Sequence, residues 1–184
     1  MKRFNASLLV LPALLLALSP LAAQDKQRVS PHETVNATID GNEVSVVYGR
    51  PYSKDPKSGE KRKIWGGVIP FSKVWRMGAD EATLLTTKQP LDMNGTAIPA
   101  GSYSLFLLPE EGGNAKLIVN KQTGQWGTRY DEKQDLARIE MKKEATAKTA
   151  DQFTIAIEKA DAGGGVLRLM WEEAQYSVPF TVTK

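Results

Sequence analysis

Hydrophobic and polar residues alternate along most of the chain beyond residue 30. In residues 43–50, for example, Val44, Val46 and Tyr48 fall on one face of an extended chain. Successive side chains of a strand point to opposite faces, so this spacing is typical of strands with one buried face. The pattern therefore predicts an all-β protein.

Turn sequences separate the alternating segments at short intervals. Asn94-Gly95 tolerates the positive φ angles of a two-residue hairpin turn, and Gly163-Gly164-Gly165 marks the sharpest break. Short connections without room for a crossover helix favour a single antiparallel β-sandwich or jelly-roll-like domain of about nine or ten strands. The expected strands cover residues 34–39, 43–50, 91–93, 96–98, 102–108, 115–120, 136–142, 152–158, 166–171 and 176–183.

Two parts of this pattern need a further argument. Residues 131–150 are rich in Glu, Lys and Ala, which favour helix, yet Leu136 and Ile139 fit neither period well. We expect a strand over residues 136–142 followed by a solvated loop, with a helix as the open alternative. Pro179 has no N–H to donate, so the last strand is expected at a sheet edge.

The N-terminus has the order of a secretory signal peptide. Lys2 and Arg3 precede an apolar run over residues 6–18, and small residues follow up to Ala23. The run is too short for a membrane-spanning helix. We expect cleavage of residues 1–23, a single domain over residues 24–184 that starts as a loose arm, a periplasmic or secreted location, and no membrane insertion after signal removal.

Composition narrows the possible partners. The chain contains no cysteine, which excludes disulfides, thiolate metal sites and a cysteine nucleophile. Signal cleavage would remove Lys2 and Arg3 from a formal net charge of +3, leaving a nearly neutral domain. Nucleic-acid-binding domains usually carry a strongly basic face. We therefore expect no nucleic-acid partner.

The alternating pattern lapses between Pro51 and Asp80. A connection of this length in a compact domain is usually functional or disordered. Residues 53–62 are polar and are predicted to form a mobile loop, whereas residues 64–71 and 74–76 are too apolar to remain in water. The apolar parts are predicted to pack on the sandwich as a long irregular segment.

Six motifs carry a resemblance to a known family. They are Arg28-Val29-Ser30-Pro31, Tyr48-Gly49-Arg50-Pro51, Lys63-Ile64-Trp65-Gly66, Trp75-Arg76-Met77-Gly78-Ala79-Asp80-Glu81-Ala82-Thr83, Pro99-Ala100-Gly101-Ser102-Tyr103 and Gln125-Trp126-Gly127. In this order and spacing they resemble the bacterial Domain of Unknown Function 2911 family, whose usual members are exported. The resemblance implies export and supports the fold, but it implies no reaction.

Arg50 shares its strand face with Tyr48, so its guanidinium is expected at a poorly hydrated position. An unpaired buried charge costs several kcal/mol, which requires an acidic partner. Asp80 and Glu81, with Arg76 beside them, are the expected partners. The cluster is interpreted either as a structural ion network that fastens the long segment or as a pocket that binds an anionic or polar group.

The four tryptophans either pack in the core or form a platform for sugar rings. Trp126 lies between glycines in Thr123-Gly124-Gln125-Trp126-Gly127, so it is expected to be the most exposed. The candidate ligand-binding residues are Tyr48, Arg50, Trp75, Arg76, Asp80, Glu81 and Trp126.

His32 is the only histidine, and the chain has neither a paired-histidine motif nor a Gly-x-Ser-x-Gly elbow. We predict no metal site, no cofactor and no catalytic residue. The chain is interpreted as a non-enzymatic module that binds a small polar or glycan ligand or an envelope protein. Two alternatives stay open: a purely structural envelope protein, and a hydrolase using Asp80 or Glu81 with His32 or Arg76, which requires His32 within about 8 Å of an acid.

Overall fold

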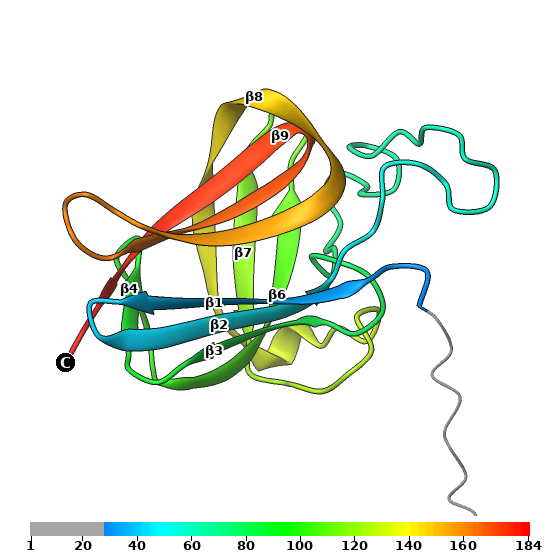
Figure 1. Ribbon diagram of the computed structural model, residues 1–184. Helices are drawn as coiled ribbons and strands as arrows, with labels where there is room; N and C mark the ends of the chain where they lie inside the picture. The colour runs from blue at the N-terminus through cyan, green and yellow to red at the C-terminus, as the bar shows by residue number, and fades with distance from the viewer. Residues whose placement is uncertain (1–27) are drawn as a thin grey trace, which may run out of the picture.

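The computed structural model describes residues 28–184, and the predicted signal peptide, residues 1–23, lies outside this range. Its elements are β1 (His32–Ile39), β2 (Asn42–Gly49), β3 (Thr83–Thr87), β4 (Leu91–Met93), β5 (Thr96–Ile98), β6 (Gly101–Pro109), β7 (Ala115–Asn120), the 3-10 turn η1 (Glu132–Gln134), β8 (Asp135–Lys159) and β9 (Gly165–Val182) (Figure 1). The all-β prediction is confirmed. Within the described range, no helix has the length and hydropathy needed to cross a membrane.

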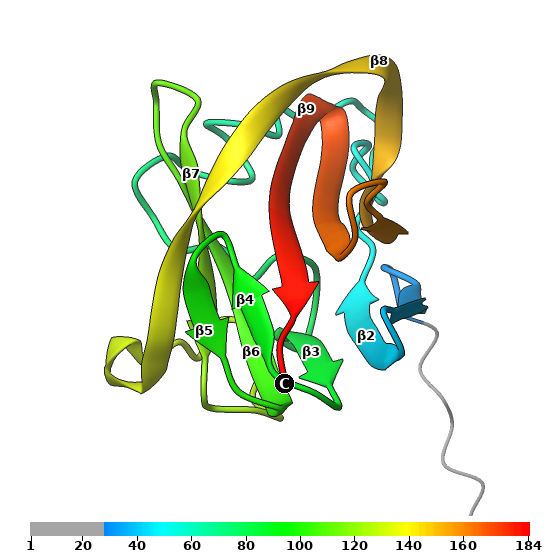
Figure 2. The ribbon, with the colours of Figure 1, turned by 90° about the vertical axis from the view of Figure 1, so that its left-hand side faces the viewer.

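The strands form one open antiparallel sheet in the order β1-β2-β3-β6-β7-β8-β9-β4-β5. The long strand β8 belongs to two parts of it, because its first residues pair with β7 and its remaining residues pair with β9. Figures 1 and 2 show how β8 and β9 arch over the part formed by β1, β2, β3 and β6. The predicted antiparallel architecture is thus achieved by a single sheet that folds back on itself.

Two pairs of predicted strands are each one bent strand. Residues 136–142 and 152–158 both belong to β8, whose register against β9 shifts between Ala145 and Ala150 and again between Ala150 and Thr154. Extra residues in one strand of a pair bend it locally without ending it. The predicted solvated loop after residue 142 is therefore wrong. In β9 the corresponding bend lies at Glu172, which has a positive φ of 52°.

Pro179 is not on an edge strand, so that prediction is also wrong. β9 lies between β8 and β4, and the ends of the sheet are β1 and β5. Pairing with β8 extends to Ser177, and pairing with β4 involves Phe180 and the residues after it. Pro179 lies where β9 passes from one partner to the other, so its missing N–H interrupts neither ladder.

The hydrophobic pattern does not predict β3, although β3 pairs with both β2 and β6. Its buried positions are Thr83, Leu85 and Thr87, so two of the three inward side chains are polar. Both threonines have buried partners: Thr83 donates to the Met77 carbonyl at 2.6 Å, and Asn42 donates to Thr87 at 2.8 Å. Satisfied hydroxyl groups replace the apolar side chains that would have marked this strand.

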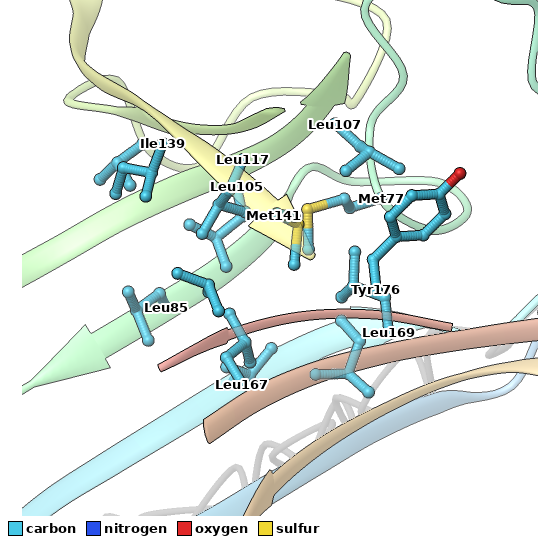
Figure 3. Close-up of a cluster of buried hydrophobic side chains, with 14 of the residues drawn as sticks. Met77, Leu85, Leu105, Leu107, Leu117, Ile139, Met141, Leu167, Leu169 and Tyr176 are labelled. Atoms are coloured by element: carbon cyan, nitrogen blue, oxygen red, sulfur yellow. The ribbon is translucent and has the colours of Figure 1, made fainter. Parts of the chain in front are cut away.

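One hydrophobic core fills the space between the two parts of the folded sheet. Leu85, Leu105 and Leu117 lie on one side of it, facing Leu167 and Leu169 of β9 (Figure 3). The two sides are also joined by a polar contact, since the Ile155 N–H of β8 donates to the hydroxyl of Tyr48 at 2.9 Å. Tyr48 is 2% exposed, so this hydroxyl has no access to solvent as an alternative partner.

Replacing Tyr48 with phenylalanine is expected to lower the free energy of unfolding by about 1–3 kcal/mol, because the buried Ile155 N–H would lose its acceptor. Urea denaturation measures this change. Tyr52→Phe is the matched control, because Tyr52 is 45% exposed and should tolerate the loss of its hydroxyl. Equal stability of the two variants would contradict a stabilising contact at Tyr48.

Candidate functional site

The irregular segment 51–80 packs on the folded sheet as predicted. Ile64, Ile69 and Met77 are buried in the core, whereas residues 56–61 are exposed. The start of the segment pairs with β8: Ser53 N–H donates to the Asp151 carbonyl at 2.7 Å, and Phe153 N–H donates to the Pro51 carbonyl at 2.9 Å. The start of the segment is therefore attached to β8, and its polar loop projects away from the sheet (Figure 1).

The end of this segment, residues 76–81, forms a tight turn that we call the site turn. Met77 and Asp80 adopt positive φ angles of 50° and 64°, which few non-glycine residues do. The Met77 carbonyl accepts from the Thr83 hydroxyl at 2.6 Å, and the Gly78 carbonyl accepts from Nε of Arg76 at 3.2 Å. Such conformations persist only where the surroundings hold them, and they concentrate at functional sites.

A close approach between two glycines holds the site turn against the end of β2. A Cβ added to Gly78 would lie 2.8 Å from the Gly49 carbonyl oxygen, and one added to Gly49 would collide with the Ala79 carbonyl oxygen. The Ala79 N–H donates to the Gly49 carbonyl at 3.2 Å. Backbone therefore packs on backbone here, which only glycine permits.

The loop around Trp126 holds the other side of the site turn. Gly127 N–H donates to the Asp80 carbonyl at 2.9 Å, and Glu81 forms an isolated bridge with Trp126. The side chain of Arg76 lies against Gly127, where an added Cβ would collide with it. The loop thus sets the direction in which the Arg76 guanidinium extends.

Arg50 does not meet the acids of the site turn, and this prediction is wrong. It forms an ion pair with Glu33, and it donates from Nε to the Phe153 carbonyl at 3.2 Å and from Nη2 to the Thr154 hydroxyl at 2.9 Å. The face that Arg50 shares with Tyr48 is the predicted one. That face meets β8, however, and β8 and Glu33 supply the partners.

The acids of the site turn pair instead with residues at the N-terminal end of the described chain. Arg28 donates to the two carboxylate oxygens of Glu81 at 2.6 and 3.0 Å. His32 Nε2 lies 3.6 Å from Asp80 Oδ2 and 3.4 Å from Glu81 Oε2. These hydrogen bonds from Arg28 lower the pKa of Glu81. The expectation of a loose arm does not hold for Arg28.

A cleft of about 520 Å³ opens beside the site turn, bounded by the arm, the irregular segment and the Trp126 loop. Its charged lining residues are Lys54, Arg62, Arg76 and Asp80, so three cations face one carboxylate. We call it the cationic cleft. Its apolar and aromatic walls are formed by Val29, Tyr52, Val68, Val74, Trp75, Phe106, Tyr130 and Trp171.

The cations of the cleft have few internal partners. Arg62 donates to the carbonyls of Tyr52 and Ser53, and Nε of Arg76 donates to Gly78. Among residues 28–184, no group accepts a hydrogen bond from the terminal nitrogens of Arg76, and no carboxylate pairs with Lys54. The lining therefore has donor capacity left for an incoming anion.

The structure brings only some of the predicted ligand-binding residues together. Trp75, Arg76 and Asp80 line the cationic cleft, whereas Tyr48 and Arg50 are not part of its lining and contact β8 instead. Trp126 is 47% exposed, which confirms its predicted exposure, but it lies outside the cleft together with Glu81. The pattern missed Lys54 and Arg62, which belong to the polar part of the irregular segment and carried no periodic signal.

Fold and site together define an all-β protein with an open, folded antiparallel sheet and a cationic cleft beside a strained turn. The chain belongs to the family described as Protein of unknown function (DUF2911), which matches residues 30–180. No curated protein and no solved structure matches the chain. The predicted family is thereby confirmed, and the match includes the site turn and the Trp126 loop.

Replacing Gly49 with alanine is expected to lower the free energy of unfolding by about 1–3 kcal/mol, because the new methyl group would force the backbone at Ala79 away. Chemical denaturation measures the loss. Gly112→Ala is the control, since a Cβ at Gly112 meets no atom within 4 Å. If Gly49→Ala proved as stable as Gly112→Ala, the close approach would not constrain the turn.

Tyr130 provides a pH-dependent signal from the wall of the cleft. Burial raises the pKa of Tyr130 to about 12 from 10.0, and the hydrogen bond to Asp135 adds to the rise. Because this pKa is higher in the folded than in the unfolded state, the stability it contributes is complete below pH 10 and is lost as pH rises through about 12.

Ultraviolet difference spectra of the wild type and Tyr130→Phe should therefore differ by one tyrosinate that ionises near pH 12. If the tyrosinate signal lost in Tyr130→Phe instead ionised near pH 10, the Tyr130 hydroxyl would not be buried and bonded to Asp135.

Proposed function

We propose that this protein is an exported, non-enzymatic module that binds a small organic anion, such as an acidic sugar, in the cationic cleft. The observation that carries the proposal is the excess of Lys54, Arg62 and Arg76 over the single carboxylate of Asp80. A planar guanidinium with free terminal nitrogens suits a carboxylate or phosphate, which it can bind through two parallel hydrogen bonds.

The walls of the cleft support a ligand with a ring or an apolar body. Tyr52 and Trp75 lie on the lining together with Val68 and Val74. Aromatic faces pack against the C–H faces of sugar rings, while the polar groups select the hydroxyl and acidic substituents. A volume of about 520 Å³ lies in the range of small-molecule sites and accommodates a monosaccharide acid.

Binding is favoured over the hydrolase alternative by the charge state of Glu81. The distance requirement for a hydrolase is met, because His32 lies within 3.6 Å of Asp80. However, a general acid or base works best with a pKa near the working pH. The hydrogen bonds from Arg28 lower the pKa of Glu81 and so move it away from neutral pH. The same ion pair occupies the carboxylate of Glu81, one of the two acids that the hydrolase alternative would use.

Binding is also favoured over a purely structural role. A structural ion network would satisfy its members internally and exclude solvent. Arg76 and Asp80 instead line an open cleft, and the terminal nitrogens of Arg76 have no acceptor among the described residues.

The proposal predicts that glucuronate binds with micromolar to millimolar affinity and that glucose, which lacks the carboxylate, binds much more weakly. Arg76→Gln should weaken glucuronate binding by about tenfold or more, because a charge-assisted pair is removed. Isothermal titration calorimetry measures both affinities, and inorganic phosphate tests whether an anion suffices without a sugar body.

Arg129→Gln is the matched control, because Arg129 is an exposed arginine of the neighbouring loop that does not line the cleft. It should leave glucuronate affinity unchanged. The proposal fails if none of the three probes binds saturably, if glucose binds as tightly as glucuronate, or if Arg76→Gln retains the wild-type affinity.

A further inference from the structure

Three potential metal ligands converge on the outer side of the site turn. His32 is the first residue of β1, and Asp80 and Glu81 lie just before β3. One ligand atom from each residue lies within 4.8 Å of the other two. We call these residues the acid-histidine cluster. The sequence predicts no metal site, because His32 is the only histidine and the chain has no paired-histidine motif.

The backbone conformation of Asp80 explains why two sequence neighbours can act together. Adjacent side chains of an extended chain point in opposite directions. Asp80 has a φ of 64°, and its carbonyl accepts from the Gly127 N–H, so the chain turns sharply between the two acids. The turn brings both carboxylates to His32 Nε2, at 3.6 and 3.4 Å.

A cation already lies among the three ligand atoms. Nη1 of Arg28 is 3.2 Å from His32 Nε2, 2.6 Å from Glu81 Oε2 and 3.9 Å from Asp80 Oδ2. The three groups therefore surround one positively charged position, and the guanidinium of the N-terminal arm occupies it. This placement, independent of the ligand spacing, indicates that the cluster accepts a cation.

We propose that His32, Asp80 and Glu81 form a divalent transition-metal site of the zinc class, for which Arg28 and the metal ion compete. One imidazole nitrogen and two carboxylate oxygens are a donor set that Zn²⁺ accepts, with water completing the coordination. Metal–ligand distances of about 2.0–2.2 Å place neighbouring donors roughly 3–4 Å apart, close to the observed spacing. Imidazole also disfavours Mg²⁺ and Ca²⁺, which prefer oxygen ligands alone.

Charge supports the exchange of Arg28 for the metal. Within the acid-histidine cluster the two carboxylates carry two negative charges, whereas Arg28 supplies one positive charge and a divalent ion supplies two. Arg28, Asp80 and Glu81 are also partly open to solvent, with side-chain exposures of 44%, 29% and 42%. An ion can therefore reach the cluster without unfolding the core, and release of Arg28 exposes no buried charge.

The competition makes an unusual prediction: removing a side chain should strengthen binding. In calorimetric titrations with ZnCl₂ on the purified, chelator-treated full chain without a polyhistidine tag, Arg28→Gln should bind one Zn²⁺ per chain about tenfold more tightly than the wild type. His32→Ala and Asp80→Asn should each weaken Zn²⁺ binding by tenfold or more. Mg²⁺ should not compete at equal concentration.

Glu140→Gln is the control for an exposed carboxylate, since Glu140 pairs with Lys116 on the surface of β8 and should not affect Zn²⁺ binding. A second measurement does not depend on the variants' stability. Because His32 is the only histidine, its imidazole gives a unique set of proton resonances, which should shift on Zn²⁺ addition to Arg28→Gln.

An unchanged or weaker Zn²⁺ affinity in Arg28→Gln would overturn the competition. Absence of saturable binding to this variant, or unshifted His32 resonances at saturation, would overturn the site itself. These outcomes can be distinguished from a failure of glucuronate to bind in the cationic cleft, because the proposed glucuronate binding depends on Arg76 and not on His32.

Discussion

The backbone contact between Gly49 and the turn at residues 76–81 is the constraint on which the candidate site depends. Glycine at positions 49 and 78 lets the end of β2 and the turn approach without intervening side chains. The hydrogen bond from Ala79 to Gly49 then fixes their relative position. Because the turn is held here, the chain keeps positive φ angles at Met77 and Asp80 that it would otherwise avoid.

This one turn separates the cationic cleft from the acid-histidine cluster. Arg76 extends to one side, where Lys54 and Arg62 join it in the cationic cleft. Glu81 extends to the other side, toward Arg28 and His32. Asp80 lies at the boundary, since it lines the cleft and also approaches His32. In our two proposals, an anion and a divalent cation bind to neighbouring residues of this one short segment, each on its own side.

The local alternation predicted the fold class. It divided β8 and β9 into two strands each, however, and it missed β3. Alternation marks any strand with one apolar face, so most of the ladder was predictable. The alternation did not predict β3, because Thr83 and Thr87 are buried polar residues. Their partners, Met77 and Asn42, lie in other parts of the chain. The bends within β8 and β9 resembled chain breaks, because a bulge disturbs the two-residue period without ending the pairing.

The sequence by itself determined the residue types of the site: the apolar anchors of segment 51–80, the chemistry of residues 75–83 and the exposed Trp126. Only the tertiary structure decided which of these side chains contact each other. Arg50 and Tyr48 share a face as the two-residue period requires, but the folding of the sheet places β8 over that face, so Arg50 binds Phe153 and Thr154. The acids of the turn were thereby left to Arg28 and His32. The two-residue period of a strand fixes the direction in which a side chain points, but long-range strand pairing supplies its partner.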